Sequence, residues 1–314
     1  MGLFSRSKKP DGWLAITLMR DAVCAAHVRR VTSGAPAVTM ASSHAATGDS
    51  AEAVLEKLAR DLHAERHQCT TLLSSREYQI LSVDSPSVPP TELKTAIRWR
   101  LKDLLDYHID DATIDVLDIP QDKNAPPRSH AMYAIAAPSA TIEHRQAVFG
   151  EARIPLSVID IPEMAQRNIA ALIEPQGRGI AMLSFDADGG LLTFSAGGEL
   201  YLARRIDVPL PSQAGADQRT AAFERITLEL QRSLDHFDRQ YHYVTLAKLV
   251  LAPLGGDGTG LREHLANNLY TPVESIDLAD VLDLAKAPAL KEPEQQQRYF
   301  LTLGAALRLE EKVL

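Results

Sequence analysis

Few side chains in this sequence are spaced for catalysis or metal binding. Asp186 and Asp188 lie two positions apart, where their carboxylates could hold Mg²⁺, because hard cations prefer oxygen ligands. A polar hairpin turn accounts for the same pair, and we expect the turn. His63 and His67 lie four positions apart, whereas zinc sites commonly need three or four protein ligands. The sequence has no Walker A, G-x-G-x-x-G or G-x-S-x-G motif, so we expect no catalytic residue and no metal site.

The composition is that of a globular protein without a general affinity for nucleic acid. The chain has 314 residues, enough for two domains, and 45% of them are hydrophobic. The 33 basic and 41 acidic residues leave a net charge of −8, whereas nucleic-acid-binding proteins show a basic face. Cys24 and Cys69 form no C-x-x-C pair, which predicts buried free thiols in a reducing compartment.

The sequence predicts neither a membrane span nor a secretion signal. It contains no apolar run of roughly eighteen residues, and the first ten residues lack the apolar centre of a signal peptide. We therefore expect a cytoplasmic protein. Residues 1–10 are basic, and we expect a flexible tail, with contact to an anionic membrane surface as the alternative.

Periodic apolar residues indicate two series of elements. We expect strands at 13–18, 22–30, 38–43, 70–74, 79–83, 114–119, 131–137 and 156–161. Helices are expected at 50–68, from 91 onward, at 139–149 and at 162–171, with Ser50 and Ser139 as N-caps. After a boundary at Pro175 to Gly179, we expect strands at 180–185, 191–196, 199–207, 247–252 and 273–276. Helices at 223–241, 261–269 and 297–312 complete the second series.

The order of these elements predicts two similar halves. Three antiparallel strands, then helix, strand, helix, strand and helix, is the order of a ribonuclease-H-like half. The first series starts in the same way and then holds an extra helix-and-sheet insertion. We predict an α/β (α+β) protein with halves at 11–174 and 178–314, whose final helix (297–312) packs back toward the first half.

The segment from Val88 to Pro120 has the most distinctive pattern in the chain. Pro89 and Pro90 can open a helix, because a missing N–H costs little in the first turn. Asp115 and Asp118 then alternate with apolar residues, roughly as in a half-buried strand. The expected apolar stripe of the helix consists of Leu93, Ile97, Leu101, Leu104 and Leu105. The pattern therefore predicts a helix docked on a sheet.

In its pattern of residues this segment resembles PilM-like proteins of type IV pilus assembly, especially the MshI proteins of MSHA pilus biogenesis. The residues that carry the resemblance are Pro90, Glu92, Leu93, Ala96, Trp99, Asp110, Asp111, Asp115 and Asp118. Those in the second half are Gly198, Arg204, Glu229, Leu230, Arg232, Ser233, Leu234, Asp235, Gly255, Gly256, Gly304, Ala306, Leu307 and Arg308. His236 and Thr302 depart from the pattern, which has tyrosine and alanine there. The resemblance extends over nearly the whole chain and implies an actin-like two-domain fold with an inserted α/β subdomain.

The resemblance also implies where a nucleotide site would lie. Actin-like ATPases cradle phosphates between two β-hairpins, each with an acidic residue for Mg²⁺ and water and a glycine for close backbone approach. By the resemblance, the first hairpin falls on Thr17 and Met19, and the second on Ser184 and Asp186. Thr17 and Ser184 carry no charge, and Met19 places a long side chain where glycine is needed. Asp186 places a negative charge against phosphate, and Arg20 is expected to be a turn residue.

The third part of such a site is better preserved. Gly255 and Gly256 could approach an adenosine closely, although glycine runs also simply form turns before helices. We expect a degenerate site that does no catalysis and needs no cofactor, with weak Mg-ATP binding left open.

The resemblance implies a scaffold peripheral to the bacterial inner membrane. It would bind the cytoplasmic tail of a bitopic PilN-like protein in a groove of the first half, and couple the platform to cytoplasmic motor ATPases. Arg98, Trp99 and Tyr107 are candidate exposed contacts, because arginine and aromatic residues dominate binding hot spots. Alternatively, Trp99 packs beneath its helix. Two other functions stay open, an active actin-like ATPase or kinase and, ranked lower, a relative of the type II secretion L-protein cytoplasmic domain.

Overall fold

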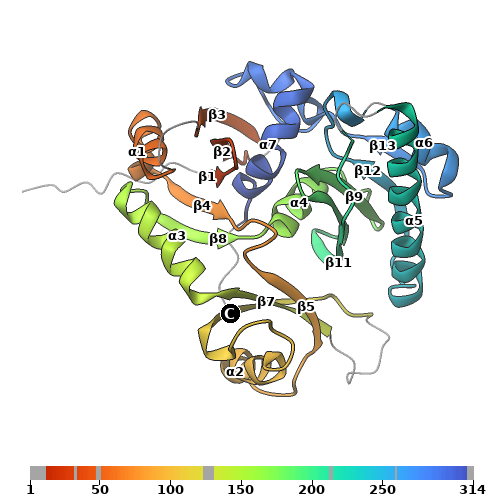
Figure 1. Cartoon of the computed structure of the whole chain (residues 1–314), viewed down its shortest axis with the longest axis horizontal. Helices are drawn as coiled ribbons and strands as arrows, with labels where there is room; N and C mark the ends of the chain where they lie inside the picture. Colours follow the sequence, from red (N-terminus) through yellow and green to blue (C-terminus); the bar gives the residue numbers. More distant parts are fainter. Residues whose placement is uncertain are drawn as a thin grey trace, which may run out of the picture.

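Two five-stranded sheets form the framework of the protein. The computed structural model describes residues 12–31, 34–46, 51–122, 131–211, 215–258 and 260–309. The first sheet has the order β3 (Ala37–Ala45), β2 (Ala22–Arg29), β1 (Trp13–Leu18), β4 (Gln68–Leu72) and β8 (Leu156–Asp160). The second has the order β11 (Glu199–Ile206), β10 (Gly189–Ala196), β9 (Gly179–Asp186), β12 (Leu246–Leu251) and β13 (Val273–Ser275). Figure 1 shows the two sheets in separate lobes, with a smaller unit below them.

Both sheets have the same topology. In each, the first three strands form an antiparallel meander, and the last two join it in parallel. Parallel strands need a crossover connection, and a helix supplies it in each half. The repeat confirms the predicted two-domain fold of ribonuclease-H-like halves.

Helices cover both faces of each sheet. On the outer faces, α1 (Ala51–Asp61) and α3 (Ser139–Glu151) pack on the first sheet, and α5 (Ala216–Gln240) and α6 (Leu261–Asn268) on the second. Between the sheets lie α4 (Pro162–Ala170) and α7 (Pro293–Ala306), which share one apolar core with the inner faces of both. Strand alternation explains the two layers, because Leu14 and Ile16 face outward to α1 while Ala15 faces the central helices.

The two central helices approach each other unusually closely at Gly304. A Cβ atom added to Gly304 would lie 2.2 Å from the backbone oxygen of Ala165 in α4. The Asn168 side-chain amide also donates to the Gly304 carbonyl at 2.9 Å. Only glycine allows this approach, which joins the two halves along α4 and α7.

The smaller unit is inserted between β4 and β8. It is a three-stranded antiparallel sheet, β5 (Gln79–Asp84), β7 (Ala131–Pro138) and β6 (Ala112–Asp118), with α2 (Pro90–Leu101) on one face. Met132 and Ala134 of β7 alternate with Tyr133, so that one face packs under α2 and the other packs on the second half. The Tyr133 hydroxyl donates to the Tyr201 carbonyl at 3.1 Å across this contact.

The predicted strands and helices are present, but several ends differ. The first helix ends at Asp61 and is followed by a short 3-10 turn, not a helix to residue 68. Helix α2 ends at Leu101, so Leu104 lies beyond it and is 53% exposed; its place in the apolar stripe was wrong. Pro138, not Ser139, occupies the N-cap of α3. The last helix starts four residues earlier than predicted, at Pro293, and ends at Ala306.

Some predictions fall outside the described residues. These are the basic tail at 1–10, the Ser50 cap and the last residues of the chain. The domain boundaries stay predictions, although residues 171–178 do connect α4 to β9 between the two sheets. In the described ranges, no helix is long and apolar enough to cross a membrane.

Candidate functional site

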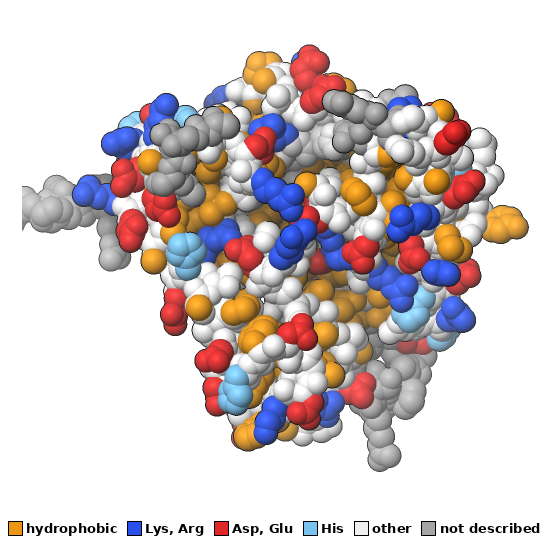
Figure 2. All heavy atoms as spheres, in the orientation of Figure 1, with side chains coloured by type: hydrophobic (Ala, Val, Ile, Leu, Met, Phe, Trp, Pro, Cys, Tyr) orange, Lys and Arg blue, Asp and Glu red, His pale blue; other side chains and the backbone are white. Residues whose placement is uncertain are grey.

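A cavity of about 620 Å³ lies between the two halves. Its walls come from the turn after β1, the turn after β9, residues 72–75 and the first half of α7. The two turns occupy equivalent positions in the two repeats, so they face each other across the cavity. On the face seen in Figure 2, basic and acidic side chains are intermixed and are not gathered by sign. This is the place where the resemblance put a nucleotide site.

The first turn presents no carboxylate from its strand. The Thr17 hydroxyl lies 2.6 Å from the hydroxyl of Thr302 in α7, and both side chains are buried. Met19 packs against the central core and accepts a contact from the Cys24 thiol at 3.6 Å. Burial raises the pKa of Cys24 to about 11, so this thiol stays protonated and is a poor nucleophile. Thr17 and Met19 therefore offer uncharged groups to the cavity, and the charged residues of this turn that line it are Arg20 and Asp21.

The second turn begins from an equally closed polar cluster. The Ser184 hydroxyl donates to Oε1 of the fully buried Gln166 at 2.5 Å. The Gln166 amide nitrogen in turn donates to the Thr193 hydroxyl at 2.9 Å and to the Met182 carbonyl at 2.8 Å. Because the Ser184 hydroxyl is hydrogen-bonded to the buried Gln166, Ser184 helps to stabilise β9.

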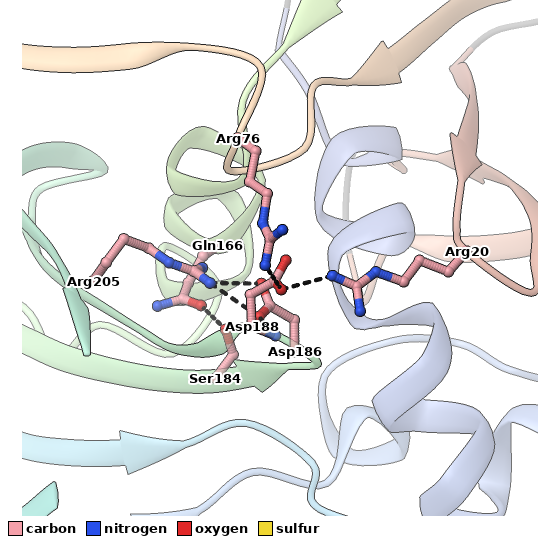
Figure 3. Close-up of polar contacts among 7 residues, drawn as sticks. All are labelled: Arg20, Arg76, Gln166, Ser184, Asp186, Asp188 and Arg205. Carbon is pink, nitrogen blue, oxygen red and sulfur yellow. Dashed lines mark hydrogen bonds and ion pairs between the residues drawn. The ribbon is translucent and has the colours of Figure 1, made fainter. Parts of the chain in front are cut away.

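Ion pairs occupy the mouth of the cavity. One carboxylate oxygen of Asp188, Oδ1, accepts from Arg20 at 2.7 Å and from Arg76 at 2.6 Å (Figure 3). Asp186 accepts a paired contact from one guanidinium nitrogen of Arg205, at 2.9 Å to each oxygen. Arginine thus neutralises the carboxylates that would otherwise attract a metal ion. In the described residues no group of three or more metal-ligating side chains occurs.

The expectation that Arg20 is a simple turn residue needs correction. Its guanidinium crosses from the first half to Asp188 in the second half. The two residues lie 168 positions apart, so no local sequence pattern links them. The duplicated fold does, because both sit in the hairpin turn that follows the first strand of their repeat.

The glycine run lies beside this cavity. The Gly255 amide donates to the side-chain oxygen of Gln297 in α7 at 2.7 Å. Gly255 lines a neighbouring cavity of about 400 Å³ at the carboxyl ends of β12 and β13, and Gly256 follows it in a 3-10 turn. The structure thus brings Thr17, Met19, Ser184 and Asp186 around one cavity, and places Gly255 at the next.

A third hollow lies in the first half, between the large sheet and the inserted sheet. This groove, of about 260 Å³, runs between β8, β6 and α3. Strand β8 ends the first sheet and β6 ends the inserted sheet. The residues that line the groove are Leu73, Thr113, Asp115, Ile135, Ala137, Ile142, Gln146, Leu156, Ser157, Val158, Ile159 and Ile161. The lining is mostly aliphatic, and its polar members are Thr113, Asp115, Gln146 and Ser157.

The three candidate contact residues lie elsewhere on the insertion. Trp99 is 72% exposed, so the alternative that it packs beneath α2 is wrong. Arg98 donates to the carbonyls of Ile109 at 2.6 Å and Ala112 at 3.2 Å, which ties α2 to β6. Tyr107 is half-buried, and its burial and nearby Asp106 raise its pKa. None of the three lines the groove.

Comparisons with known proteins support the fold. The chain is similar to a structure of the PilM-PilN type IV pilus biogenesis complex, with 19% identity, a TM-score of 0.70 and coverage of 96% of this chain and 98% of that one. A Bacteroides thetaiotaomicron protein with an actin-like ATPase fold and unknown function gives 10% identity, a TM-score of 0.49 and coverage of 93% and 100%. The cytoplasmic domain of EpsL, an inner-membrane component of the type II secretion system of Vibrio cholerae, gives 12% identity and a TM-score of 0.42. The match covers 62% of this chain and 72% of that one.

No protein-family model matches the sequence, and no curated protein matches it. The predicted two-domain fold of duplicated halves is confirmed, and the resemblance to PilM-like proteins is confirmed at the level of the fold shared with the PilM-PilN structure.

Proposed function

We propose that this chain is a PilM-like scaffold of a type IV pilus machine, of the MSHA type, at the cytoplasmic side of the bacterial inner membrane. Its partner is the cytoplasmic tail of a bitopic PilN-like protein. The observation that carries the proposal is the groove between β8 and β6, in a fold shared with the PilM-PilN complex. Through this contact the scaffold links the membrane platform to cytoplasmic motor ATPases.

The groove suits an extended segment. Strands β8 and β6 each present an outer edge, and an extended chain can add to such an edge through its backbone N–H and C=O groups. Ile135, Ile142 and Ile159 are half-buried in the groove and gain burial when apolar side chains cover them. Each further 100 Å² or so of apolar surface removed from water contributes roughly 2.5 kcal/mol before binding costs.

The cleft between the halves has a structural role in this proposal and hydrolyses no ATP. Its two turns carry the neutral Thr17 and Ser184 where Mg²⁺ would need carboxylates, and both hydroxyls are already hydrogen-bonded. Asp188 is neutralised by Arg20 and Arg76. Phosphate would therefore have to displace existing ion pairs without a metal to offset its charge.

The direct test is a calorimetric titration of the full chain with a synthetic peptide of the tail of the PilN-like protein from the same organism. The wild-type protein should bind the peptide, and Ile142→Glu in the groove should abolish the signal. Leu228→Glu is the matched control, because Leu228 is 45% exposed on α5, away from the groove. Equal binding by Ile142→Glu would refute the groove as the site. Absence of binding by the wild-type protein would refute the partner.

Trp99→Ala separates the groove from the exposed face of α2. If the groove carries recognition, this variant binds the peptide with wild-type affinity. A loss of more than about tenfold would transfer the site to α2, since an exposed tryptophan at a hot spot costs at least about 2 kcal/mol when truncated.

A further inference from the structure

The segment 73–78 joins β4 to β5 and is fastened at three separate points. Arg76 donates to Asp188 in the second half, at 2.6 Å. Both oxygens of the Glu77 carboxylate accept from Arg145 in α3, at 2.8 Å each. The hydroxyl of Tyr78 donates to Glu163 at the start of α4, at 2.5 Å. The segment is thus held by the second half, the outer helix and the central helix together.

The three fastenings differ in strength. Arg145 and Glu163 are buried, at 7% and 2% exposure, so their contacts are part of the packed interior. The Arg76 side chain is 74% exposed and its partner Asp188 is 25% exposed. An ion pair of this exposure is weak and is screened by salt. The contact with the second half is therefore the one that can open while the fold stays intact.

The first residue of the segment is shared by two hollows. Leu73 lines both the 620 Å³ cavity between the halves and the 260 Å³ groove between β8 and β6. It is 4% exposed, and its amide donates to the carbonyl of Asp160, at the end of β8, at 2.9 Å. A displacement of the segment that moves Leu73 therefore alters the wall of the groove and the pairing of β4 with β8 at its last residues.

We propose that the Asp188–Arg76 ion pair is a latch that couples closure of the cleft to the shape of the groove. The inference rests on the proposed function, because it assigns the groove to an extended peptide. In the latched state the segment 73–78 holds Leu73 in a preformed groove wall, and a peptide then binds without ordering it. If the latch raises the affinity for the peptide by some factor, the bound peptide must shift the equilibrium toward the latched, closed cleft by the same factor.

The latch replaces an exchangeable ligand with one of the chain's own side chains. In an actin-like ATPase the two hairpin turns are bridged by a bound phosphate. Here the Asp188 carboxylate bridges Arg20 of one turn and Arg76 of the connecting segment (Figure 3). Closure is thereby governed by salt and by the occupant of the groove.

Three variants at the exposed ion pair test its proposed coupling to the groove. Arg76→Ala and Asp188→Asn should weaken binding of the tail peptide by about two- to fivefold, the range that partly exposed ion pairs support. Arg76→Lys, which keeps the charge, should lose less. Arg232→Ala is the matched control, since it removes an exposed ion pair, to Glu229 within α5, that does not join the two halves. Equal loss in Arg232→Ala and Arg76→Ala would show a general charge effect and overturn the latch.

Salt adds a check that a purely structural defect would not meet. At about 1 M salt, where the Debye length is about 3 Å, the affinities of wild type and Arg76→Ala should converge. A difference that persists undiminished at high salt contradicts the ion-pair mechanism.

Hydrogen exchange tests the latch without any peptide. Asp188→Asn should speed exchange of the Leu73 amide a few-fold, because that amide is the link between the segment and β8. Unchanged exchange overturns the coupling, whether or not the peptide binds. Binding by the wild type that is lost in Ile142→Glu, with no effect of Arg76→Ala, upholds the groove and refutes the latch.

Discussion

Replacing Gly304 with alanine should destabilise the protein, although alanine is the better helix former. The added Cβ would lie 2.2 Å from the Ala165 carbonyl oxygen, 2.7 Å from its carbonyl carbon and 3.2 Å from its Cα. These are backbone atoms, so no side-chain rotation relieves the overlap. Helices α4 and α7 must separate, and both large sheets pack against them.

The magnitude follows from three contributions. Alanine gains about 1 kcal/mol over glycine in a helix interior. Overpacking a close-packed core costs about 1–3 kcal/mol and at times more. Separation also weakens the 2.9 Å hydrogen bond from Asn168 to the Gly304 carbonyl, worth about 1 kcal/mol. We therefore expect a net loss of about 1–3 kcal/mol in the free energy of unfolding.

Urea unfolding followed by tryptophan fluorescence measures this loss. Trp13 is 6% exposed in β1 and reports the first half, while Trp99 is already exposed in the folded state. Gly150→Ala is the control, because Gly150 also lies in a helix and its added Cβ would meet no atom within 4 Å. That variant should gain up to about 1 kcal/mol. A Gly304→Ala protein as stable as Gly150→Ala would refute the close packing of α4 on α7.

Three further predictions concern the cleft and its surroundings. Titration of the protein with Mg-ATP should give no heat and no thermal stabilisation at millimolar ATP, and a micromolar dissociation constant would refute the degenerate site. Gln166→Leu should destabilise by at least about 2 kcal/mol in urea, because it leaves the buried hydroxyls of Ser184 and Thr193 without their amide partner; an unchanged midpoint would contradict the buried cluster. Burial raises the pKa of Glu163 despite its hydrogen bond from Tyr78, so the stability that this group contributes is complete below its unfolded pKa and is lost as pH rises through the folded one. The urea midpoint of the wild-type protein should therefore fall as the pH rises above about 4.5, and that of Glu163→Gln should fall less. Parallel pH profiles for the wild type and this variant would exclude the Glu163 carboxyl as the cause.

The framework of the fold could be predicted because local periodicity decides it. Strands β9, β10 and β11 lie within a residue or two of the expected ranges, since apolar alternation and glycine turns mark both ends. The end of α2 could not be placed in this way. Leu104 continues the apolar spacing, but the helix stops at Leu101, where residues from β6 and β7 complete the core. Tertiary packing, which a single sequence does not display, decides such ends.

The nucleotide site stays a prediction, and the structure shows that four of its residues, Thr17, Met19, Ser184 and Asp186, line one cavity. Thr17 and Ser184 show the missing carboxylates directly by their residue types. Their actual partners, Thr302 and Gln166, carry no signal of their own, because a lone polar residue in a helix looks like a surface position until the fold buries it. Hydrogen-bond partners so far apart in the sequence can be recognised only when the three-dimensional fold is known.

The exposure of the Asp188 ion pairs determines what they can do. Pairs with one side chain more than two-thirds exposed add little to the stability of the fold, so the halves are held together mainly by the packing of α4 on α7. An ion pair that changes the equilibrium between the closed and the open cleft by only a few-fold can still determine the population of the closed state, because a binding partner can oppose or reinforce that change. A buried pair would be too costly to break and would fix a single state. We therefore propose that the cleft responds to a partner in the groove and does not hold a nucleotide.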